Sequence, residues 1–152
     1  LNQFEGNIPA WIGDLKNLEV VALYSNKFTG EIPESITNLT ALKSLELGSN
    51  YLEGNIPQTI NNLTQLKKLS LLDNKLVGEI PETISQLINL EELVLSNNQL
   101  SGALPFQLSQ LENLSLVMLS DNNLNNEYVT IVDNNPSKSS LFLEDETIVD
   151  ND

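Results

Sequence analysis

The chain has 152 residues, of which 40% are hydrophobic and 18% charged, and its net charge is −14. It contains no cysteine, histidine or arginine, which excludes disulfides, thiolate or imidazole metal ligands, cysteine nucleophiles and histidine-dependent triads within it. The acidity disfavours nucleic acid or an anionic membrane as partner, and no apolar run reaches the ~18 residues that a membrane span needs.

Proline, glycine and asparagine recur along the chain at a spacing of 24 residues. Five of the six prolines and five of the seven glycines fall on this register. A fixed period of this size indicates a repeat architecture, so each unit is expected to form one coil of an array. The recurring positions are Pro9, Pro33, Pro57, Pro81 and Pro105; Gly6, Gly30, Gly54, Gly78 and Gly102; and Asn2, Asn26, Asn50, Asn74, Asn98 and Asn122.

The repeat divides the chain into four parts. Residues 1–14 are the second half of a truncated copy, and four complete copies occupy residues 15–110. Residues 111–134 form a degenerate fifth copy, and residues 135–152 form an acidic C-terminal capping coil or tail. Because terminal repeats need a polar cap for solubility, we expect either a piece of a longer protein or a first coil that pairs with something.

Each copy contains one short segment with apolar residues at alternating positions, such as Leu45 and Leu47. This alternation predicts a strand with one buried face. The return path is too short for a crossover helix, so successive strands are expected to stack in parallel as coils of a solenoid. The predicted strands are 20–24, 44–48, 68–72, 92–96, 116–120 and 140–144.

The fixed positions of the repeat have structural interpretations. The leucine positions are expected to point inward. The asparagine column predicts a ladder, in which Asn2, Asn26, Asn50, Asn74, Asn98 and Asn122 bind backbone groups left unpaired where the chain leaves the strand. Glycine permits an unusual backbone angle or a close approach, and proline fixes φ at a position that needs no donor.

The unit reads LxxLxxLxLxxNxLxGxIPxxLxx, and the run from Leu42 to Ile60 is typical. It resembles the plant-type, 24-residue subclass of the leucine-rich repeat family, over about residues 1–134. The resemblance implies an α/β repeat fold: a curved, right-handed β-solenoid with a parallel concave sheet and an irregular or 3₁₀ convex side. It also implies a non-enzymatic recognition module without cofactor, extracellular or at the cell surface. The chain lacks the paired cysteines that flank plant arrays, so a microbial surface protein fits as well.

The variable positions on the inner wall are the predicted binding site for a protein or carbohydrate ligand, because solenoids bind through extended concave surfaces. Lys27, Tyr51 and Lys75 share one position on adjacent coils, which predicts contact with an anionic group of the partner. The alternative is that lysine stems pack on a surface tyrosine. The predicted partner-binding residues are Tyr24, Lys27, Glu46, Ser49, Tyr51, Lys68, Ser70, Asp73, Lys75, Glu92, Asn97 and Gln99.

Two other functional classes compete with recognition. A structural or adhesive role would use the array as a spacer, or let it self-associate through its first coil. An enzyme is disfavoured because adjacent acids such as Glu91 and Glu92 face opposite sides of a strand. No metal site is expected, because the runs at 121–123 and 150–152 lack a complete calcium-loop pattern.

Asn-x-Ser/Thr sequons occur at Asn38, Asn62 and Asn113, which makes these residues candidates for N-glycosylation. We expect them at the junctions between coils, away from the concave face. The alternative explanation is that the repeat itself favours Asn-Leu-Thr at that position.

The C-terminal segment has three interpretations. Leu141, Leu143 and Ile148 fall on apolar positions of the repeat, which predicts an irregular capping coil with a polar outer surface. Residues 125–152 carry seven acids against one lysine, which favours a disordered acidic tail instead. The segments 130–134 and 147–151, which have the same sequence, are also compatible with a hairpin.

Overall fold

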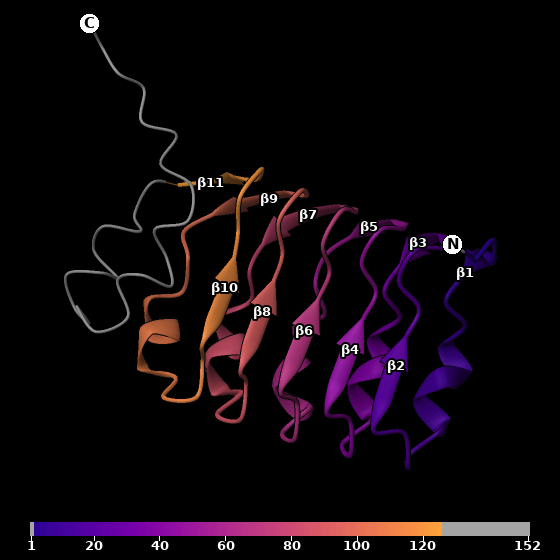
Figure 1. Cartoon of the computed structure of the whole chain (residues 1–152), viewed down its shortest axis with the longest axis horizontal. Helices are drawn as coiled ribbons and strands as arrows, with labels where there is room; N and C mark the ends of the chain where they lie inside the picture. Colours follow the sequence, from indigo (N-terminus) through magenta and orange to yellow (C-terminus); the bar gives the residue numbers. More distant parts are fainter. Residues whose placement is uncertain (1, 126–152) are drawn as a thin grey trace, which may run out of the picture.

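Two parallel sheets run along the array of coils in the computed structural model, which describes residues 2–125 (Figure 1). The first sheet is the concave one and has five strands. The second has six strands and lies beyond the carboxyl ends of the first. The strands of the concave sheet are β2 (Val20–Ala22), β4 (Ser44–Glu46), β6 (Lys68–Ser70), β8 (Glu92–Val94) and β10 (Leu116–Met118). Those of the second sheet are β1 (Glu5–Asn7), β3 (Lys27–Glu31), β5 (Tyr51–Gly54), β7 (Lys75–Glu79), β9 (Gln99–Gly102) and β11 (Asn123–Leu124).

The concave sheet forms where the alternating leucines predict it, and the predicted fold is confirmed. Its register follows the repeat, because Leu69 of β6 pairs with Leu45 on one side and with Leu93 on the other. Backbone hydrogen bonds between coils continue past the strands, as the Ser25 amide donates to the Gly48 carbonyl at 2.9 Å. The stack is therefore held by backbone pairing over a longer stretch than the three residues of each strand.

The second sheet has a different register and was not predicted. Its paired residues are 22 positions apart, as in Thr29 with Tyr51 and Glu53 with Lys75. Each of its strands except β11 contains a glycine, and none has more than two large apolar residues, so the sequence pattern alone does not identify them. This sheet places a second exposed surface beside the concave one.

Within residues 2–125, five 3₁₀ helices form the opposite, convex side of the coils. Four of them begin directly after the recurring proline, whose φ values lie between −57° and −75°. The proline ring fixes φ in this range and needs no hydrogen-bond partner for its nitrogen at a helix start. The helices are η1 (Ala10–Asp14), η2 (Glu34–Asn38), η3 (Ile60–Asn62), η4 (Glu82–Gln86) and η5 (Phe106–Gln110).

The core is one continuous apolar cluster between the sheets and the 3₁₀ helices. Each coil adds a similar set of inward apolar side chains, and the buried ones form one packed cluster. Leu69, at the centre of β6, is fully buried, as are Leu66 and Leu76 of the same coil.

Asparagine side chains link the coils where the chain leaves each concave strand. The Asn50 Nδ2 atom donates to the carbonyls of Leu47 and Leu23 at 3.0 Å, and to that of Gly48 at 3.2 Å. Its Oδ1 atom accepts from the Phe28 amide of the preceding coil at 3.0 Å. The same contacts to a preceding coil recur at Asn74, Asn98 and Asn122.

The recurring glycines have positive φ values, and most of them also accommodate a side chain of the preceding coil. Gly54 has φ +75°, and a Cβ atom there would lie 2.8 Å from the Glu31 Cγ atom. Gly6 has φ +91° but no atom of another residue within 4 Å of that position. A comparison of substitutions at Gly54 and Gly6 therefore distinguishes the cost of backbone strain from the cost of steric crowding.

We expect Gly54→Ala to lower the free energy of unfolding by more than Gly6→Ala does. Both substitutions place a side chain in the left-handed region, at about 1–2 kcal/mol, and only Gly54→Ala also displaces Glu31. Urea unfolding followed by circular dichroism measures both. Equal losses would show that the contact with Glu31 has no energetic role.

The structure describes part of the predicted domain organisation. Residues 2–125 include most of the truncated first copy, the four complete copies, and the part of the fifth copy that contains β10 and β11. The strand predicted at 140–144 and the capping coil, tail or hairpin predicted for 135–152 lie outside the described residues.

Candidate protein-binding face

The outward positions of the concave strands carry a different side chain on almost every coil. At the N-terminal end the exposed groups are apolar: Val20 is 54% exposed, and Tyr24, just beyond β2, is 55% exposed. At the other end Met118 of β10 is 37% exposed. Met118 and Leu116 were not among the predicted site residues, although each lies one repeat beyond Val94 or Glu92 and could have been found by continuing the spacing.

The centre of the concave sheet carries three charges on adjacent strands. The Lys68 Nζ atom lies 3.1 Å from a Glu46 carboxylate oxygen and 3.6 Å from one of Glu92. The hydrogen bond that Lys68 donates to Glu46 raises the pKa of Lys68 above its ordinary value; desolvation opposes this shift, and the charges of Glu46 and Glu92 add to it. Ser44 also donates to Glu46 at 3.0 Å. The structure thus brings three of the predicted residues together, and Lys68 is already paired on both sides.

The positions that follow each concave strand form a tight turn. Ser49, Asp73 and Asn97 have φ values of 54° to 57°, a left-handed conformation that serine, aspartate and asparagine tolerate better than most residues. Asn97 Nδ2 donates to Asp73 Oδ1 at 2.9 Å. These predicted site residues therefore shape the edge of the concave face, while Ser70 lies on β6 itself.

The predicted column of Lys27, Tyr51, Lys75 and Gln99 lies on the second sheet, where each residue begins a strand. The Lys75 Nζ atom lies 5.4 Å from the centre of the Tyr51 ring. The Lys27 Nζ atom instead donates to Gln3 Oε1 at 3.0 Å. Both lysines lean toward the preceding coil, so the ring contacts one ammonium group.

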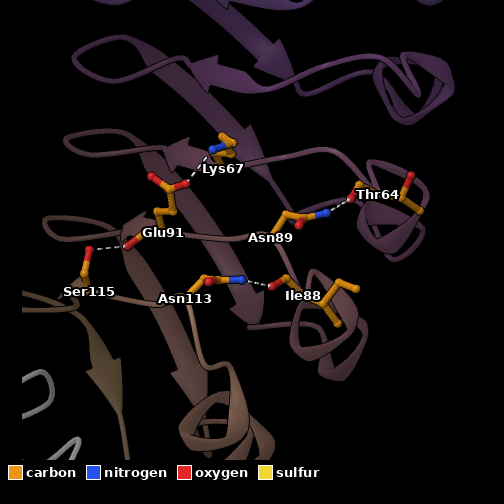
Figure 2. Close-up of polar contacts among 7 residues, drawn as sticks. All are labelled: Thr64, Lys67, Ile88, Asn89, Glu91, Asn113 and Ser115. Atoms are coloured by element: carbon orange, nitrogen blue, oxygen red, sulfur yellow. Dashed lines mark hydrogen bonds and ion pairs between the residues drawn. The ribbon is translucent and has the colours of Figure 1, made fainter.

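Ion pairs and amides connect the coils along the edge where the chain enters the concave strands. Lys43 pairs with Glu19 at 2.8 Å, and Lys67 pairs with Glu91 at 2.7 Å. Figure 2 shows the Lys67 pair next to Ser115, which donates to the Glu91 carbonyl at 3.1 Å. These pairs were not predicted; opposite charges 24 residues apart are the signal that indicates them.

A polar groove lies at the junctions between the 3₁₀ helices and the concave strands. It is open to solvent and contains two of the three sequon asparagines. Its lining residues are Lys16, Thr37, Asn38, Thr40, Asn61, Asn62, Thr64 and Gln86.

Residues 2–125 contain neither a membrane-spanning helix nor a cluster of metal-binding side chains. None of the helices in this part of the chain has the length and hydropathy that a bilayer crossing requires. The same residues hold no group of three or more acidic, histidine or cysteine side chains placed to bind a metal ion.

The repeat is matched by a known protein family. A family model described as leucine rich repeat matches residues 16–76 and 41–100, which together cover more than half of the 152 residues. The chain belongs to the leucine-rich repeat family. The asparagine links and buried leucines described above are thus features of a leucine-rich repeat array.

Solved leucine-rich repeat structures from plants are similar to this chain. The ectodomain of the Arabidopsis thaliana membrane receptor kinase GASSHO1/SCHENGEN3, in complex with CASPARIAN STRIP INTEGRITY FACTOR 2, is 39% identical with a TM-score of 0.80, covering 86% of this chain and 16% of that one. The ectodomain of the Arabidopsis receptor kinase HAESA, in complex with an IDA peptide hormone ligand, is 37% identical with a TM-score of 0.77, covering 81% and 21%.

A third similar structure belongs to another functional class. A plant ice-binding protein is 39% identical with a TM-score of 0.76, covering 79% of this chain and 39% of that one. No curated protein sequence matches the chain significantly. The chain spans only about a sixth to two fifths of the length of these three structures.

Proposed function

We propose that this leucine-rich repeat chain is a non-enzymatic recognition module that binds a protein or peptide ligand through its concave sheet. The observation that carries the proposal is the contrast between the two faces of the concave strands. The inward position of β4, β6 and β8 is a leucine in every case. The outward position that begins each strand changes from coil to coil, as Val20, Ser44, Lys68, Glu92 and Leu116.

The similar structures support a protein ligand and an extracellular location. Two of them are ectodomains of plant receptor kinases in complexes, one with a named factor and one with a peptide hormone. The ice-binding protein favours a different function. Binding to a periodic crystal requires a repeated set of identical groups, whereas the outward column of this sheet contains apolar, neutral, basic and acidic residues. The sequence of that column therefore favours a ligand with a non-repeating surface.

We further propose that Lys27 and Lys75 contact an anionic group of the ligand. Among residues 2–125 neither ammonium group lies in an ion pair with a carboxylate, whereas Lys68 lies between two. Tyr51, which is 49% exposed, offers a flat apolar surface beside Lys75. An acidic side chain or a carboxyl terminus that docks at this edge would gain charge-assisted hydrogen bonds.

The proposal is tested with a library of immobilised 12-residue peptides and the fluorescently labelled full chain. We expect a subset of the peptides to bind. The double variant Ala22→Arg/Ser70→Arg is expected to bind these peptides at least about tenfold more weakly, because both substitutions project long side chains from the concave strands. Lys27→Glu/Lys75→Glu is expected to weaken the binding of the acidic peptides in that subset selectively, because one or two charge-assisted contacts are lost.

Gln58→Arg/Gln65→Arg is the matched control, because it adds the same two charges at exposed positions outside both sheets. Peptide binding that survives Ala22→Arg/Ser70→Arg contradicts concave-face recognition. Binding of oligosaccharides but no peptides would identify a carbohydrate ligand instead. Concentration-dependent oligomers in size-exclusion chromatography, without peptide binding, would favour the adhesive role.

A further inference from the structure

The three sequons occupy two different positions of the coil. Asn38 and Asn62 end the 3₁₀ helices η2 and η3. Asn113 lies three residues beyond the end of η5, at the position that Asn89 occupies one coil earlier. The three asparagines therefore have different surroundings, although their sequence motifs are equivalent.

At Asn113 both polar groups of the sequon already link neighbouring coils. The Nδ2 atom of Asn113 donates to the Ile88 carbonyl at 2.9 Å, and Asn89, which is not part of a sequon, makes the same contact with Thr64 (Figure 2). The Ser115 hydroxyl donates to the Glu91 carbonyl at 3.1 Å. A sugar attached to Asn113 would replace one of the two hydrogens on its Nδ2 atom. The sugar would also lie close to the coil whose Ile88 carbonyl accepts the hydrogen bond from this atom.

At Asn38 and Asn62 the corresponding groups have no such role. Both asparagines are exposed, and so are Thr40 and Thr64, which complete their sequons. Within residues 2–125 these four side chains take part in no hydrogen bond. All four line the polar groove, which is open to solvent and presents hydroxyl, amide and ammonium groups to a sugar. Asn113 and Ser115 are exposed too, so the sequons differ in their hydrogen bonds and not in exposure.

We propose that Asn38 and Asn62 carry N-linked glycans in the folded, secreted protein and that Asn113 does not. In this modification the Nδ2 atom bonds to the anomeric carbon of a lipid-linked oligosaccharyl diphosphate. The bond from that carbon to the diphosphate oxygen breaks, the lipid diphosphate leaves, and the amide gives up one proton. The proposal depends on passage through a eukaryotic secretory pathway and is independent of the ligand proposed above.

Peptide-level mass spectrometry tests this assignment. The full chain is secreted from insect cells behind a heterologous signal peptide and deglycosylated with peptide N-glycosidase F in ¹⁸O water, so that each formerly glycosylated asparagine becomes a labelled aspartate. We expect label at Asn38 and Asn62, and at least about tenfold less at Asn113. Label at Asn113 equal to that at Asn62, or absence of label from both Asn38 and Asn62, overturns the proposal.

Two variants keep the test independent of folding. Thr64→Ala removes a sequon without changing Asn62, and it is expected to abolish the label there while leaving Asn38 labelled. In unglycosylated protein made in bacteria, Asn113→Ala is expected to lower the urea midpoint, whereas Asn62→Ala leaves it unchanged. Equal urea midpoints for the two asparagine variants would contradict the proposal that the hydrogen bond from Asn113 to Ile88 stabilises the fold.

Discussion

Replacing Asn50 with alanine is expected to lower the free energy of unfolding by about 3 kcal/mol. A buried polar group left without a partner costs about 1–3 kcal/mol, and Asn50→Ala removes the partner of one backbone amide and of three carbonyls. The Asn50 side chain is 6% exposed, so water reaches these groups poorly. Urea denaturation followed by tryptophan fluorescence and circular dichroism measures the loss.

Asn2→Ala is the matched control for this prediction. Asn2 occupies the same position of the repeat, but it is exposed, and within residues 2–125 its side chain forms no hydrogen bond. We expect Asn2→Ala to change the free energy of unfolding by less than about 0.5 kcal/mol, as for surface substitutions in general. Similar losses at Asn2 and Asn50 would mean that the links between coils do not explain the asparagine column.

Leu69→Ala is expected to cost about 2–5 kcal/mol, the range observed when a buried leucine is truncated in a packed core. Leu69 is fully buried at the centre of β6, and its neighbours Leu45 and Leu93 belong to the adjacent strands. A cavity at this point cannot be closed by one coil alone, because both neighbouring coils are fixed by backbone pairing. Thermal and urea unfolding both report the loss.

Leu15→Ala provides the comparison within the same residue type. Leu15 lies in the first coil and is 45% exposed, so its truncation removes less buried surface and creates no enclosed cavity. We expect its cost to stay below about 1 kcal/mol. A Leu69→Ala protein as stable as Leu15→Ala would contradict the continuous core described for the array.

The sequence predicts the concave sheet well, because each copy marks it with leucines at alternating positions. The fourth predicted strand, 92–96, contains β8, and its inward residue Leu93 is fully buried. The second sheet was missed because it depends on stacking between coils more than on local pattern. Its strand Tyr51–Gly54 offers one buried leucine and a glycine with positive φ, which by themselves suggest a bend.

The candidate site is predicted less completely than the fold. Spacing places Lys27, Tyr51 and Lys75 in one column, but it does not fix the rotamers, and Lys27 turns to Gln3 rather than to the ring. The register of 22 in the second sheet also shifts these residues relative to one another. The central charges were predicted individually, yet their pairing around Lys68 follows from side-chain reach that the sequence does not encode locally.

Within residues 2–125, the side-chain hydrogen bonds described between coils join residues 22 to 27 positions apart. None of them skips a coil, so each unit depends only on its immediate neighbours. Gain or loss of a whole 24-residue unit by unequal recombination would therefore change the surroundings of residues only in the coils next to the insertion or deletion. The number of coils can therefore change during evolution without a change in the contacts within each coil. This number sets how large a partner the concave face can contact.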